Sequence, residues 1–219
     1  MKQRLYEAGA HVDWRHRLLF IHVPKTGGRS IHSTGLFRMG HQRWHTPAKE
    51  LPREARASLL WFAAIRNPWA RFVSLWYFFR YGHEPGHPLR TRVGLKYHEK
   101  LRRWGDIETC AREITIRGNI WRPQVDWLTE GEGPERQLLV DWLLRTERLD
   151  KDWRRLALAS GLPADRWRLV RANKMEHPPW REVYTSRLRE LVAEKYADDI
   201  DFFGYTFENE LPSRNCPLF

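Results

Sequence analysis

The stretch LLFIHVPKTGGRSIHSTGLF, from Leu18 to Phe37, changes from an apolar run to a glycine turn and then to a helical pattern. The apolar residues from Arg17 to Val23 predict a short buried strand, because Pro24 stops the run. A strand that passes through a Gly-rich turn into a helix directs several backbone N–H groups at one point. The stretch therefore predicts an anion pocket at the end of a strand.

The residue types within the turn suit a phosphate or sulfate group. Gly27 and Gly28 let the backbone approach an anion closely, because no Cβ intervenes. Lys25 adds a positive charge, and Thr26 and Ser30 add hydroxyl donors. The turn differs from the Walker A loop of ATPases and kinases, in which the lysine follows the glycines. An ordinary strand-to-helix turn, with glycine for geometry and lysine for solubility, is the simpler alternative.

A second strand-to-helix turn follows in the sequence LLWFAAIRNPWARFVSLWY. The apolar run 59–66 predicts a strand, and Asn67 and Pro68 are typical of a helix cap and a first helical residue. Because parallel strands end at the same edge of a sheet, Arg66 is expected beside the first turn. Ser74 reaches the same anionic group if the helix packs beside it. Two anion sites on one edge favour a ligand with two separated phosphates.

Strands and helices continue to alternate along the chain, which predicts an α/β fold with a mostly parallel sheet. Thr46 before Pro47 has the pattern of a helix N-cap. The segment 81–106 is expected to be a loop or lid with a short helix. Further strands are expected over 137–145 and 168–173, and further helices over 146–163 and 186–205.

The composition is that of a soluble protein with one core. The chain has 219 residues, of which 42% are hydrophobic, and no apolar run approaches the roughly 20 residues that span a bilayer. The N-terminus lacks the apolar segment of a signal peptide, so a cytosolic protein is expected. Cys110 and Cys216 offer neither a disulfide framework nor a metal spacing. The net charge of +11 predicts anionic partners, although basic surfaces without a specific partner also occur.

Two other function classes remain open from these patterns. A nucleotide or small-molecule kinase would need an Mg²⁺-binding carboxylate at a strand end, and the apolar strands offer only Asp141, in the middle of the run 137–145. A basic nucleic-acid-binding protein would suit the charge, but the sequence has no helix-turn-helix, zinc-finger or RNA-binding signature. Tight, nucleotide-independent binding of random DNA in a salt titration would favour the second class.

The two turns together resemble a known family. FIHVPKTGGRSI resembles the 5′-phosphosulfate loop of the Golgi-type and bacterial carbohydrate sulfotransferases, and IRNPWARFVSLWY resembles their 3′-phosphate motif. RPQVDWL, RTERLDKDW and YADDIDFFGY resemble later segments of bacterial members, so the resemblance runs from Leu18 to Tyr205. It implies a P-loop-like three-layer fold, with a mostly parallel central sheet flanked by helices, in a single domain over 1–219. The segments 38–59 and 81–121 would bind the acceptor.

The resemblance also implies a reaction. Members transfer the sulfuryl group of 3′-phosphoadenosine-5′-phosphosulfate (PAPS) to an acceptor hydroxyl, commonly on a glycan or glycolipid, and release adenosine 3′,5′-bisphosphate (PAP). By position, the 5′-phosphosulfate would be held by Lys25, Thr26, Gly27, Gly28, Arg29 and Ser30, and the 3′-phosphate by Arg66 and Ser74. Arg29 departs from the family, in which threonine or serine is common there. No metal and no specific nucleic acid are expected, because Lys25 and the helix N–H groups supply the positive charge for transfer.

A hydroxyl acceptor also needs a general base, and histidine has a suitable pKa. His45 is the first candidate, because HTPAKEL resembles a His-Thr/Ser-x-Ala segment of bacterial members. His41 is the second and Glu50 a weaker one, while His22 is expected to have a structural role. The His41–His45 spacing also suits a metal on a helix, but no third ligand follows. The resemblance places the protein in the bacterial cytoplasm, with peripheral attachment to the inner membrane surface as a variant.

Overall fold

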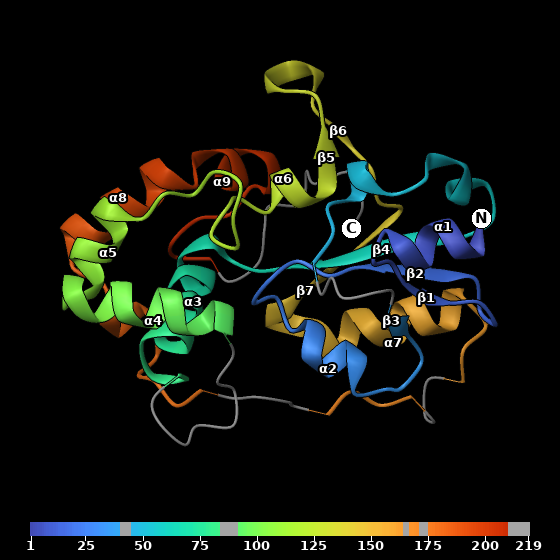
Figure 1. The fold of residues 1–219 in the computed structure, drawn as a ribbon, viewed down its shortest axis with the longest axis horizontal. Coiled ribbons are helices and arrows are strands. Elements are labelled where there is room, and N and C mark those ends of the chain that lie inside the picture. The colour runs from blue at the N-terminus through green and yellow to red at the C-terminus, as the bar shows by residue number, and fades with distance from the viewer. Residues whose placement is uncertain (40–44, 84–91, 164–166, 171–174, 210–219) are drawn as a thin grey trace. The chain divides into compact units, whose positions relative to one another are not determined.

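The computed structural model describes residues 1–39, 45–83, 92–163, 167–170 and 175–209. The chain divides into two units, of which the first contains Met1–Arg66 and Gln124–Ala172 and the second contains Asn67–Pro123 and Asn173–Glu210. The first unit holds the main sheet and the second is helical (Figure 1). The single domain that we predict over 1–219 stays a prediction.

A five-stranded sheet with the order β3-β1-β2-β4-β7 forms the centre of the first unit. β4 pairs in parallel with β2 and with β7, whereas β1 runs antiparallel to both of its neighbours. All strands of this sheet except β1 therefore point the same way, which confirms the predicted mostly parallel sheet. The strands are β1 (His11–Asp13), β2 (Leu18–Ile21), β3 (Arg38–Met39), β4 (Leu60–Ile65) and β7 (Trp142–Arg145).

Helices cover this sheet, and all four residues of β2 are buried, as expected for a strand covered on both faces. Figure 1 shows α2 (Gly28–His32) and α7 (Leu149–Ala159) on one side of the sheet and α1 (Lys2–Glu7) on the other. The unit is thus a mixed α/β structure, as predicted. Alternate strand residues form one core cluster with α2 and α7, which includes Leu18, Phe20, Phe62, Ala64, Leu144, Ile31, Trp153 and Leu156.

Two smaller elements complete the first unit. The helix α6 (Val125–Leu128) leads directly into β5 (Thr129–Glu130), which pairs antiparallel with β6 (Gln137–Leu138) in a two-stranded sheet. The run 137–145, predicted as one strand, is therefore divided between β6 and β7. That prediction was wrong because an apolar run does not show where pairing passes from one sheet to another.

The second unit consists of helices packed on α3 (Pro68–Tyr81), which contacts α4 (Arg92–Trp104) and α8 (Ser186–Lys195). α5 (Ile107–Glu113) packs on α8, and α9 (Ala197–Phe203) follows α8 in the chain. α4 has 13 residues, more than the short helix expected in the segment 81–106. Within the part of the chain that the structure describes, no helix is both long and apolar enough to cross a membrane.

The predicted start of α3 is confirmed. Pro68 is its first residue, and the Asn67 side chain accepts hydrogen bonds from the N–H groups of Trp69 (3.1 Å) and Ala70 (3.4 Å). The amide group of the same side chain donates to the carbonyl oxygens of Thr206 (2.9 Å) and Asn209 (3.1 Å). Asn67 therefore caps the helix and ties its first turn to the C-terminal part of the unit.

Three other expectations differ from the structure. The Thr46 hydroxyl donates to the Ala8 carbonyl (2.9 Å) and caps no helix, and a 3₁₀ helix, η1 (Ala48–Glu50), begins after Pro47. Residues 168–170 form no strand, and 171–173 lie outside the described residues. The C-terminal helix is divided into α8 and α9 at Tyr196, a buried residue whose hydroxyl donates to the Trp121 carbonyl (2.8 Å). Thr46 and Tyr196 are thus held by contacts with residues distant in sequence.

Candidate active site

The loop between β2 and α2 has an unusual backbone conformation. Lys25 has a φ of 67° and Gly27 a φ of 86°. A left-handed conformation is ordinary for glycine but costs a lysine about 1–2 kcal/mol. Such strain persists only where the surrounding structure maintains it. The positive φ also turns the main chain at Lys25 away from the direction of β2.

Hydrogen bonds from buried threonines hold this loop. The hydroxyl of Thr26, a fully buried residue, donates to the Val23 carbonyl (2.9 Å). The hydroxyl of Thr146, in the 3₁₀ helix η4 (Thr146–Arg148), lies 2.8 Å from the Thr26 carbonyl and 2.9 Å from the Ile65 carbonyl. The loop is thus tied to the end of β4. The Thr26 hydroxyl proton is used within the loop, so toward an anion this residue offers its main-chain N–H.

Packing favours glycine at both Gly27 and Gly28, and the left-handed backbone conformation favours it at Gly27 as well. A Cβ atom at Gly27 would lie 2.8 Å from Cδ2 of Leu149. A Cβ atom at Gly28 would lie 2.1 Å from Nε2 of His22. The imidazole of His22 therefore lies directly against the first turn of α2, a contact that the sequence pattern did not reveal.

Arg66, which follows β4, meets the same loop. Its guanidinium donates through Nη1 to the Lys25 carbonyl (3.4 Å). Its main chain is held by Gln124, a fully buried residue whose Oε1 accepts from the Arg66 N–H and whose Nε2 donates to the Arg66 carbonyl, both at 2.8 Å. The structure thus brings Lys25 and Arg66 together, as the parallel strands predict. Sequence reasoning missed Gln124, although its segment RPQVDWL was noticed.

The charges around the loop act on Lys25. Burial, followed by the positive charges of Arg66 and Arg29, lowers the pKa of Lys25 from 10.5 to about 7. Burial disfavours an ammonium ion, and nearby like charges disfavour it further. A bound anion would offset both causes, because its negative charge would pair with the charge that the protein alone destabilises. The three side chains therefore place positive charge where the sequence predicts an anion site.

His45 is the predicted base that the structure describes most closely. Its Nδ1 lies 2.9 Å from the His22 carbonyl. Because a carbonyl can only accept, Nδ1 carries the proton, and in the neutral ring Nε2 holds the lone pair that a base needs. The side chain is half-buried, with its ring edge against Trp127. Glu50 is exposed on η1, and His41 lies outside the described residues.

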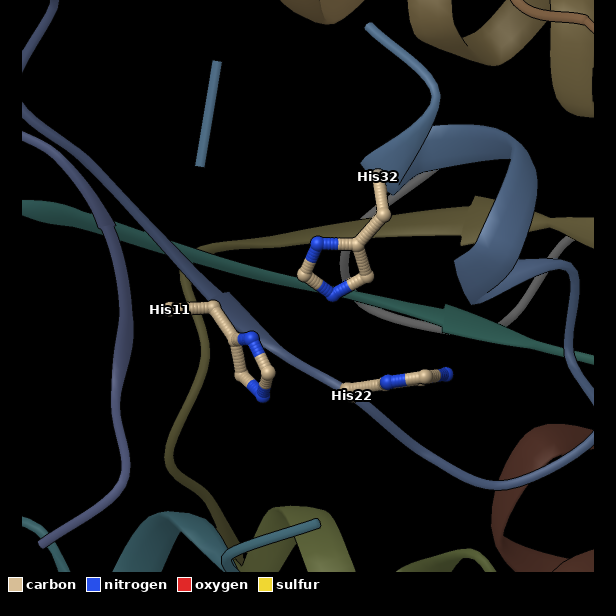
Figure 2. A group of neighbouring side chains, drawn as sticks. All are labelled: His11, His22 and His32. Carbon is tan, nitrogen blue, oxygen red and sulfur yellow. The ribbon is translucent and has the colours of Figure 1, made fainter. Parts of the chain in front are cut away.

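A second group of histidines adjoins the loop. His11, His22 and His32 each offer a ring nitrogen, and these nitrogens lie within 4.8 Å of one another (Figure 2). Burial, followed by the neighbouring His45, lowers the pKa of His22 well below its usual value. Burial, followed by His11, lowers the pKa of His32 to about 4. Both rings are therefore neutral near pH 7, which fits the structural role expected for His22.

Comparison with known proteins assigns the chain to a family. A family model described as the sulfotransferase family matches residues 9–206. This range includes β2 with the Lys25 loop that follows it, and β4 with Arg66. The chain belongs to the sulfotransferase family. Membership makes it a transferase that acts in sulfuryl transfer, with an acceptor substrate. No curated protein and no solved structure matches the chain.

The helical unit of this sulfotransferase carries the remaining predicted site residue. Ser74 lies on α3 and is buried. Arg71, three residues before it, is also buried, and its guanidinium donates to the carbonyl oxygens of Arg122 (3.0 Å) and Ile120 (3.1 Å). Arg71 thus holds the chain around 120–122 within its own unit.

Asp141, which the kinase alternative requires as a metal ligand, lies at the wrong end of the sheet. It directly precedes β7, where its Oδ2 accepts from the Trp61 N–H (2.8 Å) and its N–H donates to the Trp61 carbonyl (2.7 Å). Trp61 is near the start of β4, whereas Arg66 follows the end of β4. In this sulfotransferase the carboxylate therefore closes the amino edge of the sheet, opposite to the Lys25 loop.

Proposed function

We propose that the chain transfers the sulfuryl group of PAPS to an acceptor hydroxyl, most suitably on a glycan or glycolipid. Membership in the sulfotransferase family supports the reaction class. The observation that carries the proposal is the convergence of Lys25, Arg29 and Arg66 at the carboxyl ends of β2 and β4, with the pKa of Lys25 lowered to about 7. Such a site stabilises a polyanion at the edge of a parallel sheet where ligands bind.

The donor is bound in two parts in this proposal. The loop holds the 5′-phosphosulfate through Lys25, Thr26, Gly27, Gly28, Arg29 and Ser30. Arg66 and Ser74 hold the 3′-phosphate, a role that rests for Ser74 on the resemblance of IRNPWARFVSLWY to the family motif. α2 has only five residues, so main-chain N–H groups and the cationic side chains contribute more than its dipole.

The residues of the site would act in a single displacement. His45 accepts the hydroxyl proton at Nε2 while the acceptor oxygen forms its bond to sulfur. The bond from sulfur to the oxygen that bridges sulfur and the 5′-phosphate breaks, and Lys25 neutralises the charge that builds on that oxygen. PAP leaves with the bonding electron pair. Positioning and fixed positive charge supply the catalysis, as in phosphoryl transfer.

The acceptor-binding segments stay a proposal at 38–59 and 81–121. Most of α4 lies in the second of them, and its last turn carries Arg102 and Arg103. Basic side chains on a helix favour an anionic or sugar-rich acceptor, and a solvated helix face is the simpler alternative. The hydroxyl that is sulfated is best identified by offering acceptors of known structure to the enzyme.

Isothermal titration calorimetry with PAP, AMP and ATP tests the donor assignment. Wild-type protein is expected to bind PAP at least about tenfold more tightly than AMP, because a second phosphate meets a second cationic group. Arg66→Ala and Ser74→Ala are expected to reduce this preference, and Lys25→Ala to abolish sulfuryl transfer from PAPS. Arg56→Ala, an exposed arginine paired with Asp141 at the amino edge, is the matched control and is expected to bind as wild type.

Two results would contradict the donor assignment. Equal affinity of the wild-type protein for AMP and PAP would remove the argument for two phosphate sites. An unchanged preference in both Arg66→Ala and Ser74→Ala would move the 3′-phosphate to other residues. The ratio of the two affinities is the decisive quantity, because a partly unfolded variant loses both ligands together.

A further inference from the structure

Three histidines from three consecutive elements meet beside the Lys25 loop (Figure 2). His11 lies on β1, His22 directly follows β2, and His32 is the last residue of α2. Their ring centroids are 4.7 Å (His11–His32), 5.4 Å (His22–His32) and 5.8 Å (His11–His22) apart. Figure 2 shows that the three side chains come from separate segments, and one ring nitrogen of each lies within 4.8 Å of the others.

The sheet register explains why these side chains converge. His11 pairs with Phe20 across β1 and β2, so both side chains lie on one face of the sheet. His22 is two residues beyond Phe20 and returns to that face. α2 packs on the same face, as the burial of Ile31 against Phe20 shows. The Phe20 ring contacts all three imidazoles, at 6.1 Å, 5.4 Å and 5.7 Å from His11, His22 and His32.

We propose that His11, His22 and His32 bind one divalent transition-metal ion, for which Zn²⁺ is the best match. Imidazole nitrogen is a preferred ligand of zinc, and three histidines leave a fourth position for water. Zn–N bonds of about 2.0–2.1 Å place tetrahedral ligand nitrogens about 3.4 Å apart. Because the histidine nitrogens already lie within 4.8 Å of one another, small rotations of the side chains complete the site.

The surroundings of the group set its affinity. His11 and His22 are buried and packed on Phe20, so an apolar wall orients two ligands and limits access of water. Arg29 is the positive charge that acts on His22 and His32, and it opposes a cation. It is exposed, so solvent screens that repulsion. The His45 ring lies 4.4 Å from that of His22, but its Nδ1 bonds the His22 carbonyl, and we leave it outside the ligand set.

The ion has a structural role in this proposal. It joins β1 to the end of β2 and to α2, and β2 and α2 are the two elements that flank the Lys25 loop. It also fixes the imidazole of His22, which lies against Gly28 in the first turn of α2. Sulfuryl transfer does not depend on it, because Lys25, Arg66 and His45 are not ligands. The metal site and the proposed function can therefore be tested independently, and failure of one does not contradict the other.

Metal binding to the tag-free full chain tests the proposal. Protein treated with a chelator is dialysed against micromolar Zn²⁺, and the metal content is measured by atomic emission. One Zn²⁺ ion per chain is expected, together with a rise in the thermal unfolding temperature, because a ligand that binds only the folded state stabilises it. Co²⁺ in place of Zn²⁺ is expected to give the strong visible absorption of a tetrahedral site.

Two histidine variants separate this site from adventitious binding. His32→Ala is expected to weaken Zn²⁺ binding by more than about tenfold and to remove the thermal shift. His177→Ala, which removes another half-buried histidine far along the chain, is expected to behave as wild type. His11→Asn is the second ligand variant, in case His32→Ala folds poorly. Failure of the wild-type protein to bind Zn²⁺, or equal binding by wild type, His32→Ala and His11→Asn, would overturn the proposal.

Discussion

Lys25 combines two energetically unfavourable features, one in its backbone and one in its side chain. Its backbone has a positive φ, and its ammonium group is opposed by burial and by Arg66 and Arg29. A cost of this kind is retained where function requires it. Because the negative charge of a phosphosulfate would offset both opposing causes, Lys25 is expected to favour an anionic ligand.

His45 is the residue at which the mechanism can be tested most directly. His45→Asn keeps a side-chain N–H that can donate to the His22 carbonyl but removes the base at Nε2. We expect the rate of sulfuryl transfer to fall about 10²-fold or more, while the affinity for PAP stays at the wild-type value. The acid limb of the pH–rate profile is also expected to disappear. These quantities are measured by steady-state kinetics over pH and by calorimetry.

His16→Asn is a matched control for this substitution. His16 is another half-buried histidine, and its Nδ1 bonds Asp13 at 2.6 Å. It is expected to leave the rate and the pH profile unchanged. A wild-type rate in His45→Asn would assign the base to another residue, with Glu50 and His41 as the next variants.

At the scale of elements, the two strand-to-helix turns are held in different ways. The turn after β2 is stabilised by threonine hydroxyls and by the packing of Gly27 and Gly28, without a side-chain cap on α2. The turn after β4 continues into α3, which Asn67 caps. In the second turn a side chain therefore satisfies the first N–H groups of the helix, whereas no side chain does so at the start of α2.

Asn67→Ala is expected to destabilise the protein by about 2–4 kcal/mol. The substitution removes a cap, which costs about 1 kcal/mol, and also leaves the carbonyl groups of Thr206 and Asn209 without their buried donor. Thr185→Ala removes the cap of α8, where the exposed threonine hydroxyl accepts from the Leu188 N–H and donates to the exposed Glu108 carboxylate (3.3 Å). This control is expected to cost about 1 kcal/mol. Urea unfolding of both variants measures the difference, and equal costs would contradict the tertiary role of Asn67.

At the scale of the molecule, the chain has a net charge of +11, and three of its positive side chains lie together at the Lys25 loop. Lys25, Arg29 and Arg66 place three positive charges within interaction distance in the first unit. Like charges held together destabilise the compact state, so this arrangement lowers the stability of the fold when no anion is bound. A polyanionic donor is expected to stabilise the protein in return.

The pH dependence of stability follows from the pKa of Lys25. The folded-state value of about 7 lies below the value of 10.5 for an unperturbed lysine. Between these values the unfolded chain binds the proton and the folded chain does not, so this group makes the free energy of unfolding rise with pH. Lys25→Met removes that contribution. The variant is therefore expected to be more stable than wild type near pH 6.5, by a margin that shrinks as the pH approaches 10.

Urea unfolding of both proteins between pH 6.5 and pH 9.5 measures this margin. The difference in unfolding free energy between the two proteins cancels the contributions of other groups that titrate in this range. Lys195 is one such group, because burial lowers its pKa as well. A margin that stays constant over the whole range would show that Lys25 keeps an ordinary pKa in the folded protein. Addition of PAP is expected to remove the advantage of Lys25→Met, because the 5′-phosphate of PAP pairs with the Lys25 charge.

The sequence predicted those parts of the fold whose signals are local. Pro24 and the glycines mark the end of β2, and Asn67-Pro68 marks the start of α3, because caps and breakers act within a few residues. Resemblance of the same short motifs to the sulfotransferases was confirmed by the match over residues 9–206. The predictions failed where local pattern competed with distant contacts, as at Thr46, which bonds Ala8 and caps no helix.

The sequence by itself determined the order of Lys25, the glycines and Arg66 after two neighbouring strands, and the chemistry that we propose for the site rests on this order. Tertiary structure alone decided how that chemistry is held. Gln124 bonds Arg66 from 58 residues away, and Thr146 bonds the Thr26 carbonyl from 120 residues away. The lowered pKa of Lys25 and the convergence of His11, His22 and His32 likewise depend on burial and strand register. These properties arise only when distant segments exclude water from one another, so no local pattern contains them.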